Sequence, residues 1–160
     1  MIRRWLPKII SLLFLVTLCL LSAQRASAAP GCEVSASGIA FGSYDAVGVN
    51  ATAPLDGTGT ITVTCGSANN TANAAISTGG SGSFIPSRRM VSGANILDYN
   101  LYTDATYSAI WGDGTGGSQM ASITVDNTKQ GSRTIYGRIP AGLDPATGNY
   151  SDTLIVTITF

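Results

Sequence analysis

The side chains that could do chemistry are few in this chain and widely spaced. Histidine is absent, so a nucleophilic serine, threonine or cysteine would need a lysine or a carboxylate as its base. Beyond the N-terminal region the available lysine is Lys129, which lies in a turn-like stretch, Asp126-Asn127-Thr128-Lys129-Gln130-Gly131. The nine acidic residues occur singly, which gives no carboxylate pair for glycoside hydrolysis. The sequence therefore predicts neither an enzyme nor a cofactor.

Metal ligands are equally scarce. The segment Asp113-Gly114-Thr115-Gly116-Gly117 lacks the alternating acidic residues of a calcium loop and is more typical of a plain turn. Two cysteines without a histidine cannot complete a zinc shell. We expect no metal site.

Residues 1–28 have the pattern of a secretory signal peptide. A positively charged start is followed by an apolar run over residues 9–21 and by Ala26-Ser27-Ala28, which matches a cleavage site. The apolar run is too short for a membrane anchor. Cleavage after Ala28 leaves residues 29–160, which is the length of one domain.

Cys32 and Cys65 are the cysteines of this exported part. In an oxidising compartment an even pair predicts a disulfide, and two separate buried thiols are the alternative. A bond that closes a loop of about thirty residues stabilises a fold by roughly 3–4 kcal/mol in the chain-entropy model.

The charge of the exported part argues against a nucleic-acid partner. It carries five basic and nine acidic residues, a net charge of −4. Phosphate neutralisation requires clustered lysine and arginine. The composition is that of a soluble, secreted protein.

Short alternating stretches separated by glycine, asparagine and aspartate follow Cys32, and none has a convincing helical pattern. We expect strands at residues 33–41, 59–65, 73–78, 88–91, 97–103, 123–125, 133–139 and 150–160. Short strands at this spacing in a secreted chain of this length predict a single antiparallel β-sandwich.

The last predicted strand has the strongest alternation. Leu154, Val156, Ile158 and Phe160 share one face, and Ile155, Thr157 and Thr159 share the other. Most domains finish on a frayed polar tail, whereas this sequence stops on Phe160 within a strand pattern. We expect the last strand to be a sheet member that something else must complete.

Trp111 and Tyr107 are candidate glycan contacts, together with the neighbouring tyrosines. Exposed aromatic rings can form a platform for sugars, but in a sandwich of this size such residues more often pack in the core or at strand ends.

An ordered series of segments resembles the spore coat protein U domain family across essentially the whole exported chain. The series begins with Cys32 at the start of a strand. The segments that follow are Gly38-Ile39-Ala40-Phe41-Gly42-Ser43-Tyr44, Ile61-Thr62-Val63-Thr64-Cys65, Arg89-Met90, Leu97-Asp98-Tyr99-Asn100-Leu101-Tyr102-Thr103-Asp104, Trp111-Gly112-Asp113-Gly114, Tyr136-Gly137-Arg138-Ile139-Pro140-Ala141 and Gly148-Asn149-Tyr150-Ser151-Asp152-Thr153.

The family includes subunits of archaic chaperone–usher pili and a secreted coat protein of myxobacterial spores. The resemblance implies an immunoglobulin-like sandwich that lacks its final strand, with a groove beside an open sheet edge. A periplasmic chaperone and then another pilus subunit would fill the groove by strand addition, with an outer-membrane usher as a further partner. It also implies that Leu154, Val156, Ile158 and Phe160 line this groove.

The resemblance leads us to interpret the chain as a structural subunit of a secreted surface fibre. Only Ala29-Pro30-Gly31 separate the predicted cleavage site from Cys32, too few for a donor strand, so we expect a tip or terminal position. The alternatives are a cell-surface or spore-coat protein that forms no fibre and a carbohydrate-binding adhesin.

Overall fold

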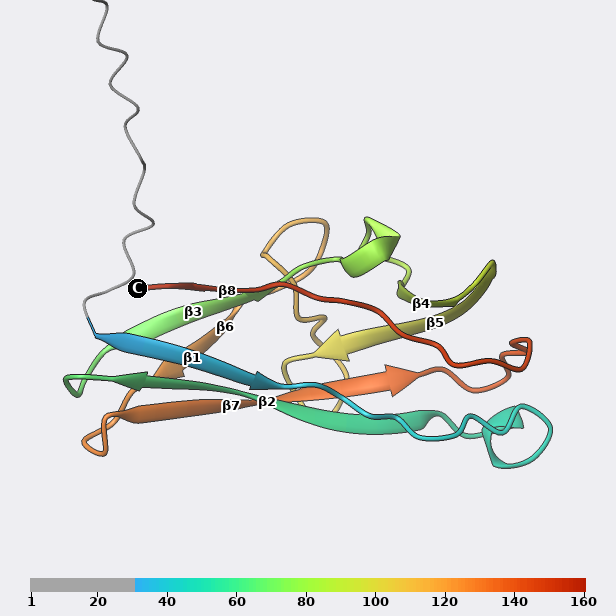
Figure 1. The fold of residues 1–160 in the computed structure, drawn as a ribbon, viewed down its shortest axis with the longest axis horizontal. Coiled ribbons are helices and arrows are strands. Elements are labelled where there is room, and N and C mark those ends of the chain that lie inside the picture. Colours follow the sequence, from blue (N-terminus) through green and yellow to red (C-terminus); the bar gives the residue numbers. More distant parts are fainter. Residues whose placement is uncertain (1–30) are drawn as a thin grey trace, which may run out of the picture.

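The computed structural model describes residues 31–160 and folds them into two antiparallel sheets that form a sandwich (Figure 1). The larger sheet has the order β1-β2-β7-β5-β4, and the smaller has the order β6-β3-β8. The strands are β1 (Cys32–Ser37), β2 (Leu55–Cys65), β3 (Thr71–Ile76), β4 (Arg88–Ser92), β5 (Asn95–Tyr102), β6 (Ala121–Thr124), β7 (Gln130–Ile139) and β8 (Val156–Thr159). The all-β class is therefore confirmed, and each predicted strand has a counterpart. The predicted signal peptide, residues 1–28, lies outside the described residues.

Helical structure within the described part is limited to two short 3-10 turns, Val49–Ala51 and Gly79–Ser81. None of the helices in residues 31–160 has the length and apolar character needed to cross a membrane.

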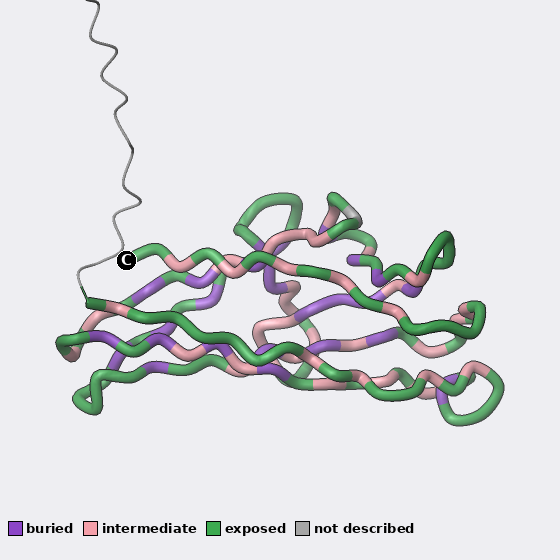
Figure 2. Tube along the Cα trace, in the orientation of Figure 1, coloured by how far each residue is buried: buried purple, intermediate pink, exposed green. Residues whose placement is uncertain are grey.

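Alternation along the central strands builds the core. In β2, Ile61, Val63 and Cys65 are buried while the threonines between them are more exposed. In β3, which belongs to the smaller sheet, Ala74 and Ile76 are buried on the face that meets the larger sheet. Figure 2 shows buried stretches concentrated in the inner strands. Each large apolar side chain removed from water contributes about 1.5–3 kcal/mol, so this two-layer core is the main source of stability.

The predicted disulfide is formed. Cys32, the first residue of β1, lies directly opposite Cys65, the last residue of β2, in the antiparallel ladder. Their Sγ atoms are 2.02 Å apart. The bond therefore fixes one end of β1 to the neighbouring strand.

Arg88 connects the two sheets on the side of the sandwich away from β1. Its side chain is fully buried, and its guanidinium donates to the carbonyl oxygens of Ser77 at 3.0 Å and Trp111 at 2.6 Å and to Oδ1 of Asn100 at 2.8 Å. Burial lowers the pKa of Arg88 to about 10, yet the group stays charged near neutral pH. A buried cation needs such a set of acceptors, so Arg88 holds β4, β5 and the end of β3 together.

The first strand is shorter than the predicted 33–41 because the chain turns over the inner face of the sheet after Ser37. Ile39 and Phe41 cover glycines of β2 and β7. A Cβ on Gly57 would lie 2.7 Å from Cγ2 of Ile39, and one on Gly137 would lie 2.7 Å from Cζ of Phe41. The missing side chains therefore make room for this segment.

The last strand is also shorter than the predicted 150–160, because this segment passes from one sheet to the other. Ser151 forms an isolated bridge with Val91 at the edge of β4. Further along, the carbonyl of Ile155 accepts from the Ser77 amide at 2.9 Å, and then β8 pairs with β3. No single ladder spans the whole segment.

Candidate functional site

The inner face of β1 carries apolar side chains that the core does not cover. Val34 and Ala36 pair with Val63 and Ile61, and directly opposed residues share a face of the sheet. Val63 and Ile61 are 0% exposed, whereas Val34 is 44% exposed. The core-facing side of β1 is therefore open.

The inner face of β8 also carries apolar side chains that the core covers only in part. Val156 and Ile158 pair with Ile76 and Ala74, both buried, and Leu154 continues the alternation. Leu154, Val156 and Ile158 are only half-buried against the core. Phe160, just beyond β8, is 47% exposed.

Both strands are also at the edges of their sheets. Among the described strands, β1 pairs with β2 alone and β8 pairs with β3 alone. Each strand thus presents one row of backbone N–H and C=O groups without a ladder partner, which is a template for a further strand.

An apolar cleft of about 410 Å³ separates the two edges. Ala36 and Ser37 at the end of β1 line one wall, and Leu154 and Val156 line the other. Five buried core residues also line the cleft: Ile76, Met90, Tyr99, Leu101 and Ile135. The core is thus accessible from outside along this line.

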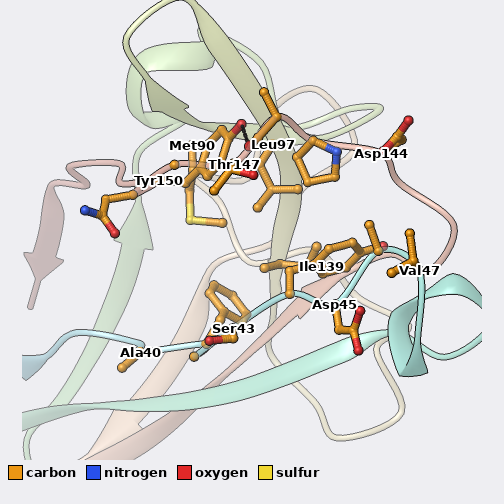
Figure 3. Close-up of a pocket in the computed structure, with 18 of the residues that line it drawn as sticks. Ala40, Ser43, Asp45, Val47, Met90, Leu97, Ile139, Asp144, Thr147 and Tyr150 are labelled. Carbon is orange, nitrogen blue, oxygen red and sulfur yellow. Dashed lines mark hydrogen bonds between the residues drawn. The ribbon is translucent and has the colours of Figure 1, made fainter.

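A second cleft, of about 730 Å³, continues the first. The two share Ile39, Phe41, Met90 and Tyr150, so we treat them as one groove with a narrow part and a wide part. Figure 3 shows the wide part, with Met90 and Tyr150 on one wall and Ser43 on the other.

Asp152 fixes the wall of the groove that leads into β8. Its Oδ2 accepts from the Tyr99 hydroxyl at 2.7 Å, and its Oδ1 accepts from the Gly80 amide at 3.0 Å. Burial, together with the bond to Asp152, raises the pKa of Tyr99 well above its usual range. A Cβ on Gly79 would lie 2.1 Å from Oδ2 of Asp152, so the turn requires glycine there.

Trp111 is not available to a glycan, which corrects the sequence-based interpretation. Its side chain is 0% exposed, and its Nε1 donates to the Ala74 carbonyl at 2.9 Å. The indole fills the core beneath β3, because a ring of this size gains more from burial there than from solvent contact.

Tyr107 lies on the outer face of the larger sheet, apart from Trp111. Its ring packs edge-on against Tyr102 and Tyr136, with centroids 5.4 and 6.4 Å away. The Arg138 guanidinium lies 3.5 Å from its ring centroid and pairs with Asp56 at 2.7 Å. The hydrogen bond from Arg138 is the main cause that lowers the pKa of Asp56. The structure does not test a glycan contact at Tyr107, which stays a prediction.

Sequence reasoning missed Asp152 and the inner face of β1 as parts of this site, and it missed the burial of Arg88 on the opposite side of the sandwich. The alternation of Val34 and Ala36 was visible, but nothing in the sequence showed that their inner face lacks a cover. Arg88 has the same parity as the buried Met90 on β4, which was the available signal for its burial.

Two known proteins resemble this chain, one in sequence and one in fold. Protein U of Myxococcus xanthus is 35% identical over 130 residues, which covers 75% of this chain and 70% of that protein. The CsuC–CsuE chaperone–tip adhesion subunit pre-assembly complex from archaic chaperone–usher Csu pili of Acinetobacter baumannii contains a chain with the same fold. That match has a TM-score of 0.56 at 22% identity and covers 81% of this chain but 39% of the matched chain.

A weaker likeness, with a TM-score of 0.43 and 14% identity over 79% of each chain, is to the Escherichia coli Hda pilus minor tip subunit HdaB. The family model of the Spore Coat Protein U domain matches residues 17–157, from within the predicted signal peptide into β8. Because this match covers most of the sequence, the chain belongs to the Spore Coat Protein U domain family.

Proposed function

We propose that the protein is a structural subunit of a secreted surface fibre, and that a strand from another polypeptide fills the groove between β1 and β8. One observation carries the proposal: two facing edge strands present core-directed apolar side chains that remain partly exposed. A sandwich that was complete in itself would cover them.

Strand addition would satisfy both requirements of the groove at once. The backbone of an inserted strand would pair with a free edge, and its alternate side chains would cover Val34, Val156 and Ile158. Covering a large apolar side chain contributes about 1.5–3 kcal/mol, so a few such contacts supply useful affinity after the cost of ordering the strand.

The partners that fit this proposal are a periplasmic chaperone, an outer-membrane usher and other pilus subunits. Family membership supports a location at the extracellular surface, and the fold is shared with a chain from a chaperone–subunit complex. A terminal place in the fibre is the finer form of the proposal. It rests on the predicted cleavage site, which leaves Ala29-Pro30-Gly31 ahead of Cys32.

Co-purification from the periplasm tests the proposal. The full chain, expressed with the chaperone and usher genes of its own organism, should be isolated as a one-to-one complex with the chaperone. Ile158→Asp should abolish the complex because it puts a charge on the inner face of β8. Ser122→Asp, on the exposed face of β6 at the other edge of the same sheet, is the matched control. A wild-type chain that is isolated free of the chaperone when the two are expressed together would contradict strand complementation.

A coat protein that forms no fibre is the second candidate function. The similarity to Protein U, at 35% identity over 70% of its length, favours it specifically. Immunogold labelling of whole cells separates the two, because a fibre subunit labels projecting filaments and a coat protein labels the envelope or spore surface evenly.

A further inference from the structure

The two parts of the groove differ in chemistry. The narrow part, between β1 and β8, is bounded largely by aliphatic side chains, and its one carboxylate, Asp152, is already engaged by Tyr99 and Gly80. The wide part carries Asp45 and Asp144 among its lining residues. One groove therefore offers an apolar section and an acidic section.

The two carboxylates lie on different walls. Figure 3 shows Asp45 on the wall formed by the segment after β1 and Asp144 on the wall that leads towards β8. Asp45 is held in place because its Oδ1 accepts from the Gly48 amide at 2.9 Å and its own amide donates to Oδ1 of Asn50 at 2.9 Å. A segment lying in the wide part would pass between the two walls that carry these exposed carboxylates.

No basic side chain of residues 31–160 lines either part of the groove. Arg138 is paired with Asp56 and Arg89 with Asp98, and Arg88 is buried against carbonyl groups. Lys129 and Arg133 lie near the start of β7, which pairs with the disulfide end of β2, whereas Ile139 at the other end of β7 lines the wide part. The acidic section is thus uncompensated within the described fold.

We propose that the strand which fills this groove has alternating apolar side chains in the narrow part and a lysine or arginine in the wide part, between Asp45 and Asp144. This inference rests on the proposed function. An alternating strand can slip by two residues or enter in the reverse direction with the same face inward. A charge pair at one end distinguishes these arrangements, because complementary charges fix register and direction more than they add affinity.

Three synthetic peptides test the inference on the purified, exported chain. Each has about twelve residues of alternating threonine and valine, the span of an extended strand along the groove, and ends in two lysines, two glutamines or two glutamates. Fluorescence anisotropy at low salt should show the lysine peptide binding about threefold to tenfold more tightly than the glutamate peptide, the range for partly exposed ion pairs. The difference should shrink at high salt, since screening shortens the reach of these charges.

The variant D45N/D144N should remove the preference for lysine while keeping the affinity for the glutamine peptide. Asparagine retains the acceptor that Asp45 offers to Gly48, so the loop stays folded. Asp113→Asn, in an exposed loop outside the groove lining, should leave the preference unchanged. Equal binding of all three peptides, or a preference that survives D45N/D144N, would overturn this inference and leave the proposed function standing. Failure of all three to bind would overturn both.

Discussion

The two long sides of the sandwich differ in how completely their core-facing side chains are buried. On the side of Arg88 and Trp111, both side chains are fully buried and every polar contact of the guanidinium is made inside the protein. On the side of β1 and β8, Val34 is 44% exposed although it faces the core. The side of Arg88 and Trp111 is fully packed, whereas the side of β1 and β8 leaves core-facing apolar surface exposed.

This contrast separates a fully packed side of the domain from a side whose core-facing side chains stay partly exposed. The closed side fixes the positions of β3, β4 and β5 through Arg88, and the Tyr99–Asp152 contact extends that order to the segment before β8. The groove is therefore already formed in the chain alone. Substitutions on the closed side should lower the free energy of unfolding whether the groove is empty or filled. Substitutions on the open side should mainly weaken the binding of a strand in the groove.

The largest effect should come from the closed side. Trp111→Ala should lower the free energy of unfolding by about 3–5 kcal/mol, because a buried tryptophan leaves a cavity and the Ala74 carbonyl loses its donor. Urea unfolding of the purified chain measures this. The loss should be the same with and without a bound peptide, and a loss below about 1 kcal/mol would show that this side is not the anchor of the fold.

The second largest loss of stability should come from removing the disulfide. Replacing both cysteines, C32S/C65S, should cost roughly 2–4 kcal/mol of unfolding free energy. Since five of the six residues of β1 are exposed, little else than its ladder to β2 holds this strand. Thermal unfolding of oxidised wild type against the double variant checks the prediction, and an unchanged midpoint would mean that β1 is attached by contacts outside this account.

A smaller and conditional effect should come from Val34→Ala. With the groove empty the change should stay within about 0.5 kcal/mol, as for other exposed positions. With the lysine-ended peptide, binding should weaken about tenfold, because two methyl groups worth about 0.8 kcal/mol each are no longer buried. Val91→Ala, at a 50% exposed position on β4, is the matched control. Equal effects of the two variants on peptide binding would contradict the assignment of Val34 to the groove.

Acid should act mildly on the chain without a bound peptide. Arg138 holds the pKa of Asp56 below the ordinary 3.8, and serine and threonine hydroxyls with backbone amides lower the pKa of Asp104. A carboxylate with a lowered native pKa binds protons less readily when folded, so its stabilisation is present above pH 3.8 and is lost as the pH falls below that value. Urea midpoints of the chain without peptide should fall between pH 5 and 3. Asp56→Asn should flatten the decline, and an unflattened curve would assign the acid sensitivity to other groups.

The parts of the fold that local pattern determines could be predicted from the sequence. Alternation placed Leu154, Val156 and Ile158 on one face, and the redox argument paired Cys32 with Cys65. The length of the last strand could not be predicted, because its pairing partners lie on two sheets. Alternation records which side chains point inward but not which neighbour offers backbone hydrogen bonds.

The partners of the buried positions that depend on distant segments could not be predicted from the sequence either. As a residue type, Arg88 is expected at the surface. Only the fold brings the carbonyl groups of Ser77 and Trp111 to its guanidinium. As a residue type, Trp111 fits both a binding platform and a core, although the core is the commoner place in a sandwich of this size. Likewise the first strand stops at Ser37 because glycines on β2 and β7 make room for Ile39 and Phe41, and no local signal encodes that.

Amide hydrogen exchange in β1 and β8 is the most direct test of the central claim that these strands form an open groove. The exported chain would be measured alone and with the lysine-ended peptide at saturation. The account predicts that amides on the free edges of β1 and β8 exchange quickly in the chain alone and become protected when the peptide binds, while those of β2 and β7 are protected in both states. Protection of both edges before any peptide is added, or no change in them at saturation, would contradict it.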